Sequence, residues 1–240
     1  MKKRYGLLLF VLFLLAARMT AARAQSRAEK PLTLIVYMCG SNLESEGASA
    51  TRDLEEMENA GFDESKLNVL VMTGGSRRWH NGQSGEGTVL TQVGNHKSRE
   101  LKEESPPLSM GDPETLAWLM RFARERYPAQ SYALILWDHG AGPLGGVCLD
   151  EQHAPDRLTL DELGLALEAA GQPEKLRWIG FDACLMSTVE VASALSPWAD
   201  YLIASQETEP SAGWDYSFLR DLAENPEPES TARRIIDLYI

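Results

Sequence analysis

Two side chains that could form a nucleophile and base pair each closely follow an apolar run of sequence. His139 comes two residues after the run 132–137 (YALILW), and Cys184 comes three residues after the run 176–181 (LRWIGF). A free cysteine is mostly protonated near neutral pH, so a nearby imidazole makes it a far better nucleophile. Ligands gather beyond the carboxyl ends of parallel strands. The sequence therefore predicts that His139 and Cys184 lie together at that edge of a sheet.

The residues around this pair suggest how it would be activated. Cys184 is predicted to open a helix over 186–195, whose dipole would favour the thiolate. Gly140 would let the backbone approach a substrate closely, and its N–H and that of Cys184 are a predicted oxyanion hole. A lone cysteine after a strand is more often a small buried apolar residue than a nucleophile. The presence of both groups at equivalent strand ends favours the catalytic interpretation.

The elements that would position the pair alternate between strands and helices, which predicts an α/β fold with a largely parallel sheet. A hairpin with arms at 88–93 and 98–102 interrupts the alternation. Thr159 and Glu162 form a predicted capping box. The predicted strands are 32–38, 67–73, 132–137, 176–181 and 201–204, and the predicted helices are 46–60, 112–127, one starting after Thr159, and 186–195. The helical pattern at 233–240 has no C-cap, so we expect the natural polypeptide to continue.

Length and composition set wider limits. The chain has 240 residues, 44% of them hydrophobic, which fits one α/β domain with a sizeable core. Its formal net charge of −12 is the wrong sign for general nucleic-acid binding. Three cysteines do not make a disulfide framework.

The first 24 residues have the pattern of a secretory signal peptide. A basic start is followed by the apolar stretch 6–17, and Ala22-Arg23-Ala24 has the small-x-small pattern of a cleavage site. We therefore predict cleavage after Ala24 and a mature domain over 25–240. The mature chain would be secreted or periplasmic, free of the membrane, and strongly acidic.

Several spaced blocks of the chain resemble the clostripain family of the caspase-like cysteine peptidases. The matching blocks are TLIVYMCGSNLES (33–45), GGSRRWHNG (74–82), YALILWDHGAGPLGG (132–146), VCLDE (147–151), LTLDEL (158–163), WIGFDACLMSTVEVA (178–192) and IASQETEPSAGWDY (203–216). The resemblance implies a caspase-like three-layer sandwich with a mostly parallel central sheet flanked by helices. It also implies an endopeptidase that cuts after Arg or Lys with a Cys–His dyad, here Cys184 and His139, through a thioester acyl-enzyme.

The same resemblance assigns the substrate pocket. Asp182, two residues before the nucleophile, corresponds to the acidic residue at the pocket floor, although it could also cap a helix. A carboxylate there can pair with a guanidinium or ammonium group. A second pocket carboxylate is expected from the loop after the fifth strand, where Glu207, Glu209 and Asp215 remain open alternatives. Trp214 in that loop would either wall the pocket or belong to the core.

Some relatives are zymogens that are cleaved between the dyad residues, and Arg157 is the favoured self-cleavage position here, ahead of Lys175. No cofactor is expected to be required. A calcium site at Asp150-Glu151 is possible, but solvated carboxylates are the simpler interpretation. No closely spaced ligand pair predicts zinc. The G-x-G-x-x-G match at 140–145 does not predict a nucleotide site, because Pro143 argues against a helix opening there. The alternative function is a catalytically silent fold that binds protein partners.

Overall fold

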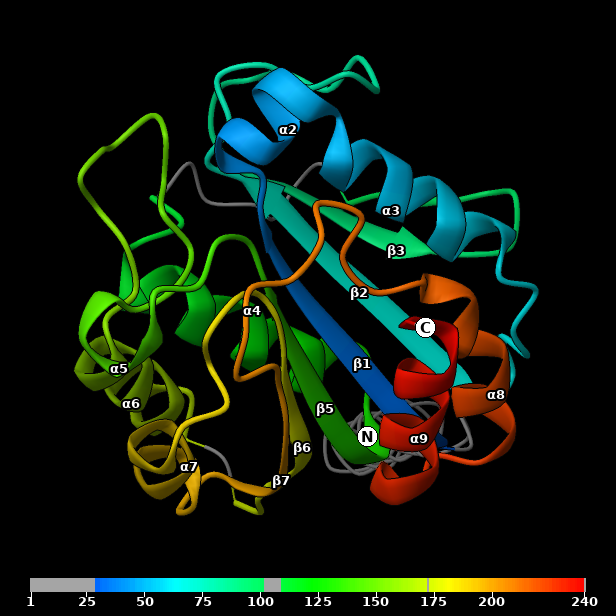
Figure 1. The fold of residues 1–240 in the computed structure, drawn as a ribbon. Coiled ribbons are helices and arrows are strands. Elements are labelled where there is room, and N and C mark those ends of the chain that lie inside the picture. The colour runs from blue at the N-terminus through cyan, green and yellow to red at the C-terminus, as the bar shows by residue number, and fades with distance from the viewer. Residues whose placement is uncertain (1–28, 102–108, 172, 240) are drawn as a thin grey trace, which may run out of the picture.

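A single seven-stranded sheet forms the centre of the molecule (Figure 1). The computed structural model describes residues 29–101, 109–171 and 173–239, so the predicted signal peptide lies outside the described residues. The strand order is β4-β3-β2-β1-β5-β6-β7. The strands are β1 (Lys30–Cys39), β2 (Leu67–Gly74), β3 (Val89–Val93), β4 (Arg99–Glu100), β5 (Ala129–Trp137), β6 (Leu176–Asp182) and β7 (Ala199–Ile203). β1, β2, β5, β6 and β7 are parallel, and β3 and β4 form the predicted antiparallel hairpin.

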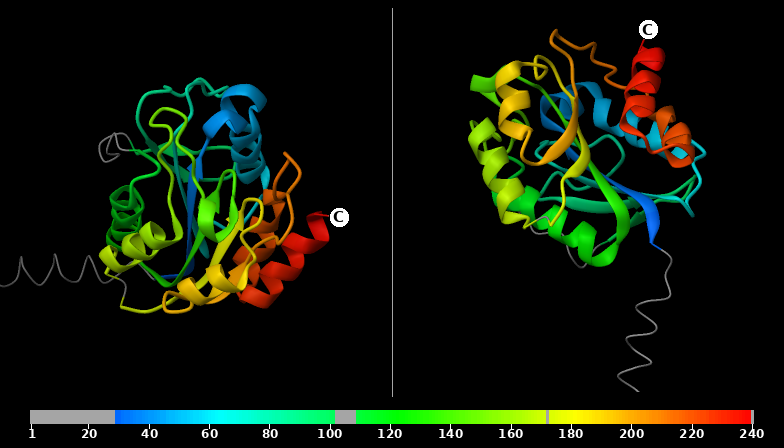
Figure 2. Two further views of the ribbon diagram at one scale, coloured as in Figure 1. Left: turned by 60° about the vertical axis from the view of Figure 1, so that its left-hand side comes forward. Right: turned by 90° about the horizontal axis from the view of Figure 1, so that it is seen from below.

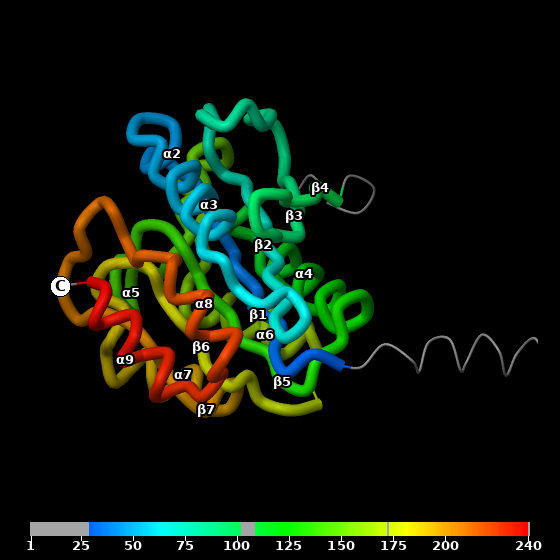
Figure 3. The backbone as a smooth tube through the Cα atoms, turned by 90° about the vertical axis from the view of Figure 1, so that its right-hand side faces the viewer, coloured from blue at the N-terminus to red at the C-terminus, as the bar shows by residue number. Residues whose placement is uncertain are grey.

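Helices cover both faces of this sheet and complete three layers (Figures 1 and 2). One face carries α4, α6 and α7, and the other carries α3, α8 and α9; Figure 3 shows α8 and α9 side by side on the second face. The helices are α2 (Ser41–Gly47), α3 (Ser49–Asn59), α4 (Pro113–Arg126), α5 (Gly142–Gly145), α6 (Leu160–Ala169), α7 (Val189–Leu195), the 3₁₀ turn η1 (Tyr216–Phe218), α8 (Leu219–Glu224) and α9 (Pro228–Tyr239). In the described ranges, no helix combines the length and apolar character needed to span a bilayer.

The central strand β1 shows why the sheet is buried on both faces. Alternate side chains of a strand point to opposite faces. Ile35 and Tyr37 pack into the core beneath α4 and α6, whereas Val36 and Met38 pack into the core beneath α3 and η1. Because neither face is exposed to water, the strand is a continuous apolar run rather than an alternating one.

The prediction of one continuous helix over 46–60 is wrong. Ala48 adopts a left-handed conformation with φ of 56° and separates α2 from α3. Glu44 of α2 is a buried carboxylate that accepts hydrogen bonds from the backbone N–H (2.9 Å) and the hydroxyl (2.6 Å) of Thr51 in the first turn of α3. This carboxylate stabilises the start of the second helix.

Two further helices near the strand ends differ from the prediction. α7 begins at Val189 rather than at residue 186, because Thr188 is its N-cap and its hydroxyl accepts from the N–H of Val191. The single turn α5 occupies 142–145, where Pro143 was expected to prevent a helix; proline is compatible with a first turn. The capping box at Thr159 and Glu162 is confirmed.

Candidate active site

A cavity of about 260 Å³ opens at the carboxyl ends of β5 and β6. β1 is the point at which the chain order of the sheet reverses, with β2 on one side and β5 on the other. Such switch points are where open parallel sheets bind ligands. The residues that line the cavity include Trp137, His139, Asp182, Cys184, Glu209 and Gly213. The structure therefore brings the predicted nucleophile and base to one cavity.

His139 is carried by a rigid strand end. The preceding residue, Asp138, is buried; its carboxylate accepts from the Ser41 hydroxyl (2.5 Å) and from the Leu149 N–H (2.6 Å). These bonds join the ends of β1 and β5 to the loop after α5. Burial raises the pKa of Asp138 to about 7. Asp138 thus fixes the backbone from which the imidazole projects.

Asn42 is a site residue that sequence reasoning did not identify. Its side-chain oxygen lies 2.9 Å from Nε2 of His139. An amide oxygen is an acceptor, so this contact favours the tautomer with a proton on Nε2 and leaves Nδ1 as the acceptor. Burial lowers the pKa of His139, which favours the neutral imidazole that a general base requires. The sequence position of Asn42 was a usable signal. Asn42 follows β1, and β1 is adjacent to β5, which ends just before His139.

Cys184 lies in the turn after β6, which corrects the prediction that it opens a helix. The helix dipole therefore does not act on its thiol. Instead, the backbone N–H of Glu209 donates to Cys184 Sγ over 3.2 Å. Two more bonds tie this turn to the loop after β7, from Leu185 N–H to the Glu207 carbonyl (3.1 Å) and from Ser187 N–H to the Ser205 carbonyl (2.8 Å). The nucleophile and the loop thus form one hydrogen-bonded unit.

Gly140 packs against the backbone of this turn. A β-carbon at Gly140 would lie 2.1 Å from the Cys184 carbonyl oxygen and 3.1 Å from the Ala183 side chain. Within the described residues, the N–H groups of Gly140 and Cys184 donate to no protein acceptor. The two predicted oxyanion donors therefore lie on adjoining segments with their hydrogen atoms uncommitted.

Three acidic residues line the cavity: Asp138, described above, and the pair Asp182 and Glu209. Asp182 is buried, and it accepts from the Trp214 N–H (3.2 Å) and from the Tyr216 hydroxyl (3.0 Å). Oε2 of Glu209 is buried without a hydrogen-bond partner in the described part of the chain. Burial raises the pKa of Asp182 to about 7, and burial together with the charge of Asp182 raises that of Glu209 to about 8. A cation in the cavity would pair with both groups and favour their ionised forms.

A further carboxyl group, outside the cavity lining, supports the cavity from behind. Asp53 of α3 is buried, and its Oδ2 accepts from the indole N–H of Trp137 over 2.7 Å. Burial raises the pKa of Asp53 to about 9, with a further contribution from Asp182. The bond holds the Trp137 ring, which is one wall of the cavity.

The remaining predicted pocket residues lie outside the cavity. Glu207 is exposed, and Asp215 caps η1 by accepting from the Ser217 N–H (2.8 Å). Trp214 is buried in the core beneath α3 and η1 rather than forming a cavity wall. Of the three alternatives for the second carboxylate, only Glu209 lines the cavity.

The Asp150-Glu151 pair is bonded rather than solvated. Asp150 is buried and accepts from the N–H groups of Met110 (2.8 Å) and Gln152 (2.8 Å). Glu151 accepts from the Arg77 N–H (3.0 Å). The described residues contain no cluster of three or more His, Cys, Asp or Glu that could hold a metal ion.

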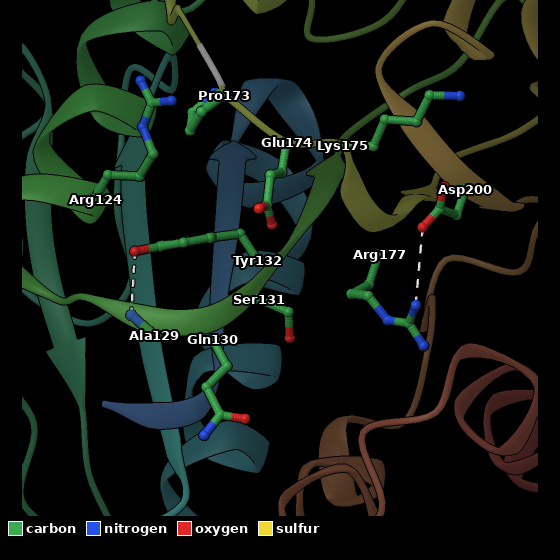
Figure 4. A pocket seen from close by; sticks show the side chains of 10 residues that line it. All are labelled: Arg124, Ala129, Gln130, Ser131, Tyr132, Pro173, Glu174, Lys175, Arg177 and Asp200. Carbon is green, nitrogen blue, oxygen red and sulfur yellow. Dashed lines mark hydrogen bonds and ion pairs between the residues drawn. The ribbon is translucent and has the colours of Figure 1, made fainter. Parts of the chain in front are cut away.

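A second cavity, of about 560 Å³, lies at the opposite edge of the sheet, where β5, β6 and β7 begin (Figure 4). Figure 4 shows Arg177 paired with Asp200 (3.8 Å) and the Tyr132 hydroxyl accepting from the Ala129 N–H (3.1 Å). It contains none of the predicted catalytic or pocket residues.

Known proteins resemble this chain in both sequence and fold. Clostripain of Hathewaya histolytica is 29% identical over 217 residues, covering 78% of this chain and 41% of the relative. A secreted C11 cysteine protease from Bacteroides thetaiotaomicron, solved with an irreversible peptide inhibitor, has a TM-score of 0.69 at 25% identity. An inactive zymogen C11 protease from Parabacteroides distasonis has a TM-score of 0.66 at 26% identity. The chain covers 58% of each solved chain, and each match covers 88% of this one.

The comparisons confirm the predicted resemblance and the predicted fold class. The sequence model of the clostripain family matches residues 36–240, which is most of the chain. The cavity residues at the ends of β5 and β6 fall within this matched range. This chain belongs to the clostripain family.

Proposed function

We propose that this chain is the catalytic part of a cysteine endopeptidase that cleaves after Arg or Lys. One observation carries the proposal: His139, Cys184, Asp182 and Glu209 all line a single cavity. The first two supply a base and a nucleophile, and the other two supply negative charge for a basic side chain. The family and the relatives described as cysteine proteases support the same activity.

The reaction follows from these groups. His139 accepts the thiol proton of Cys184, and the sulfur attacks the carbonyl carbon of the bond after Arg or Lys. The N–H groups of Gly140 and Cys184 stabilise the resulting oxyanion. The imidazolium then donates its proton to the leaving amine, and a thioester remains on Cys184. Water, deprotonated by His139, hydrolyses the thioester and restores the thiol.

The carboxyl pair accounts for the choice of Arg or Lys. Both groups have raised pKa values in the free protein, and Glu209 Oε2 has no hydrogen-bond partner among the described residues. A guanidinium or ammonium group would supply donors to this oxygen and favour ionisation of the pair. A neutral side chain would leave the buried oxygen unpaired, which disfavours its binding.

The test uses peptidyl-coumarin substrates with Arg, Lys or Gln before the cleaved bond. Wild type should cleave the Arg and Lys substrates at least 100-fold faster than the Gln substrate, and Cys184→Ala should abolish cleavage. Cys184→Ala should keep the fold because Cys184 is only partly buried, so the smaller side chain leaves little empty space in the core. No Cys184-dependent cleavage would instead support a catalytically silent fold that binds proteins.

Export and self-processing form a further part of the proposal. Secretion is supported by the signal-like sequence and by the relative described as secreted; the exported form should begin at Gln25. Self-cleavage after Arg157 would have to open a β-bridge, because the N–H of Leu158 donates to the Val147 carbonyl (2.9 Å). Mass spectrometry of wild type, Cys184→Ala and Arg157→Gln should show a cut after Arg157 in wild type alone. Intact wild type that is active would refute this step.

A further inference from the structure

Three large apolar side chains are exposed beside the catalytic turn. They are Leu144 of α5, Leu185 of the turn after β6, and Val189 of α7, with exposed fractions of 97%, 38% and 76%. None of them lines the cavity that holds the two carboxyl groups. We call these residues the leaving-side patch. Exposed apolar groups gathered beside a cavity mark a surface that binds something.

The backbone brings the leaving-side patch together from separate elements. α5 contacts α7, and a β-carbon at Gly142 would lie 3.6 Å from the Leu185 carbonyl oxygen. Val189 is the first residue of α7, four residues after Leu185. Figure 1 shows α5 and α7 on one side of the turn after β6, and the loop after β7 on the other side. That loop contributes Glu209 to the cavity, whereas no residue of the patch lines it.

Leu185 holds an unfavourable backbone conformation at this position. Its φ of 64° is left-handed, which is uncommon for a bulky residue and easier for Asn or Gly. The conformation is fixed by the bond from its N–H to the Glu207 carbonyl and by the buried neighbour Met186. Core packing does not explain a leucine here, because the side chain is exposed. Strain of this kind at an exposed site points to a functional role.

The proposed reaction indicates which part of the substrate would reach the leaving-side patch. His139 must give its proton to the leaving nitrogen, so the residues after the cleaved bond emerge beside His139. α5 begins three residues after His139, so that segment passes toward the leaving-side patch. We propose that the patch binds an apolar side chain of the substrate on the leaving-group side of the cleaved bond. This inference rests on the proposed endopeptidase function.

The test compares two internally quenched peptides that share Arg before the cleaved bond. One has Leu at both positions after the bond, and the other has Ser. Burial of part of a leucine side chain predicts a kcat/KM about tenfold higher for the Leu peptide in wild type. Leu144→Ser and Val189→Ser should each lower this ratio at least threefold. Leu165→Ser is the matched control, because Leu165 is 56% exposed on α6, away from the cavity, and its ratio should stay at the wild-type value.

The variant Leu185→Asn separates a loss of substrate binding from a loss of folding. Asn accepts the left-handed backbone more readily than Leu, so the thermal midpoint should stay equal or rise while the ratio falls. A wild-type ratio near one, or a ratio unchanged in all three patch variants, would overturn the inference. An Arg-coumarin substrate has no leaving peptide and reports the proposed function alone. Cys184-dependent cleavage of that substrate with a ratio near one refutes only the patch, whereas no cleavage refutes both proposals.

Discussion

Gly140→Ala should strongly lower the proposed peptidase activity by displacing Cys184. The new β-carbon would lie 2.1 Å from the Cys184 carbonyl oxygen, whereas real β-carbons essentially never approach a neighbour within 3.0 Å. The two segments must therefore separate by about 1 Å. A displacement of about 1 Å at a catalytic group costs about 100-fold in rate, or ~2.7 kcal/mol. The variant keeps the Gly140 N–H, so the effect measures displacement and not the loss of a donor.

The assay measures kcat/KM on an Arg-coumarin substrate, together with the thermal midpoint. Gly164→Ala is the matched control: Gly164 lies within α6, and a β-carbon there would meet nothing within 4 Å. This control should retain wild-type activity and gain about 0.5–1 kcal/mol of stability, because alanine favours a helix over glycine. A folded Gly140→Ala variant with kcat/KM within threefold of wild type would refute the close packing of Gly140 on the Cys184 turn.

Three further expectations concern the groups around the dyad. Asn42→Ala should lower kcat about tenfold, which is the effect of one lost hydrogen bond. Asn42→Asp should raise the pKa of His139 and so move the acidic limb of the kcat/KM profile to higher pH. Identical pH profiles for wild type and Asn42→Asp would contradict the Asn42 contact. The inhibition constant of agmatine, a cationic arginine analogue, should be about tenfold weaker at pH 6 than above pH 8, because the carboxyl pair (pKa values about 7 and about 8) ionises over that range. Since folding raises both pKa values from the ordinary carboxyl values of about 4, the free protein should also lose stability as pH rises from about 4 to about 8, and Asp182→Asn should weaken both trends. Asp53→Ala should lower the free energy of unfolding by about 1–3 kcal/mol and raise KM, because it leaves the Trp137 N–H unpaired. Asp53→Asn keeps an acceptor and should restore most of the stability and of the wild-type KM. Equal KM values in the two variants would count against a positioning role.

The sheet was predictable because its signals are local. The strands β1, β2, β5 and β6 are apolar runs buried on both faces, and each was predicted to within a few residues. The capping box at Thr159 likewise depends on two side chains three residues apart. Such features need no knowledge of the tertiary structure. The placement of His139 and Cys184 at one cavity was also predictable, since strand ends in a parallel sheet meet at one edge.

The errors arose where burial, a helix cap or a distant partner decides local structure. The break at Ala48 comes with a buried carboxylate, Glu44, that accepts a hydrogen bond from the first turn of the next helix. A glutamate in a helical pattern is normally predicted to be exposed, so this role was not expected. The late start of α7 removed the helix dipole from Cys184. The choice among three loop carboxylates depended on the path of the loop after β7, which no short sequence pattern encodes. Asn42 was missed because its partner is 97 residues away.

The loop after β7 links substrate recognition to the nucleophile through a single residue. Glu209 offers its N–H to Cys184 Sγ and its carboxyl group to the cavity. A shift of this residue toward a bound cation would therefore change the hydrogen bond to the sulfur. The bonds at Leu185 and Ser187 restrain the same loop, so such a shift must stay small unless they break. It follows that a substrate side chain in the cavity and the state of the thiol are energetically coupled, and a cationic ligand should alter the reactivity of Cys184 even when it does not touch the sulfur.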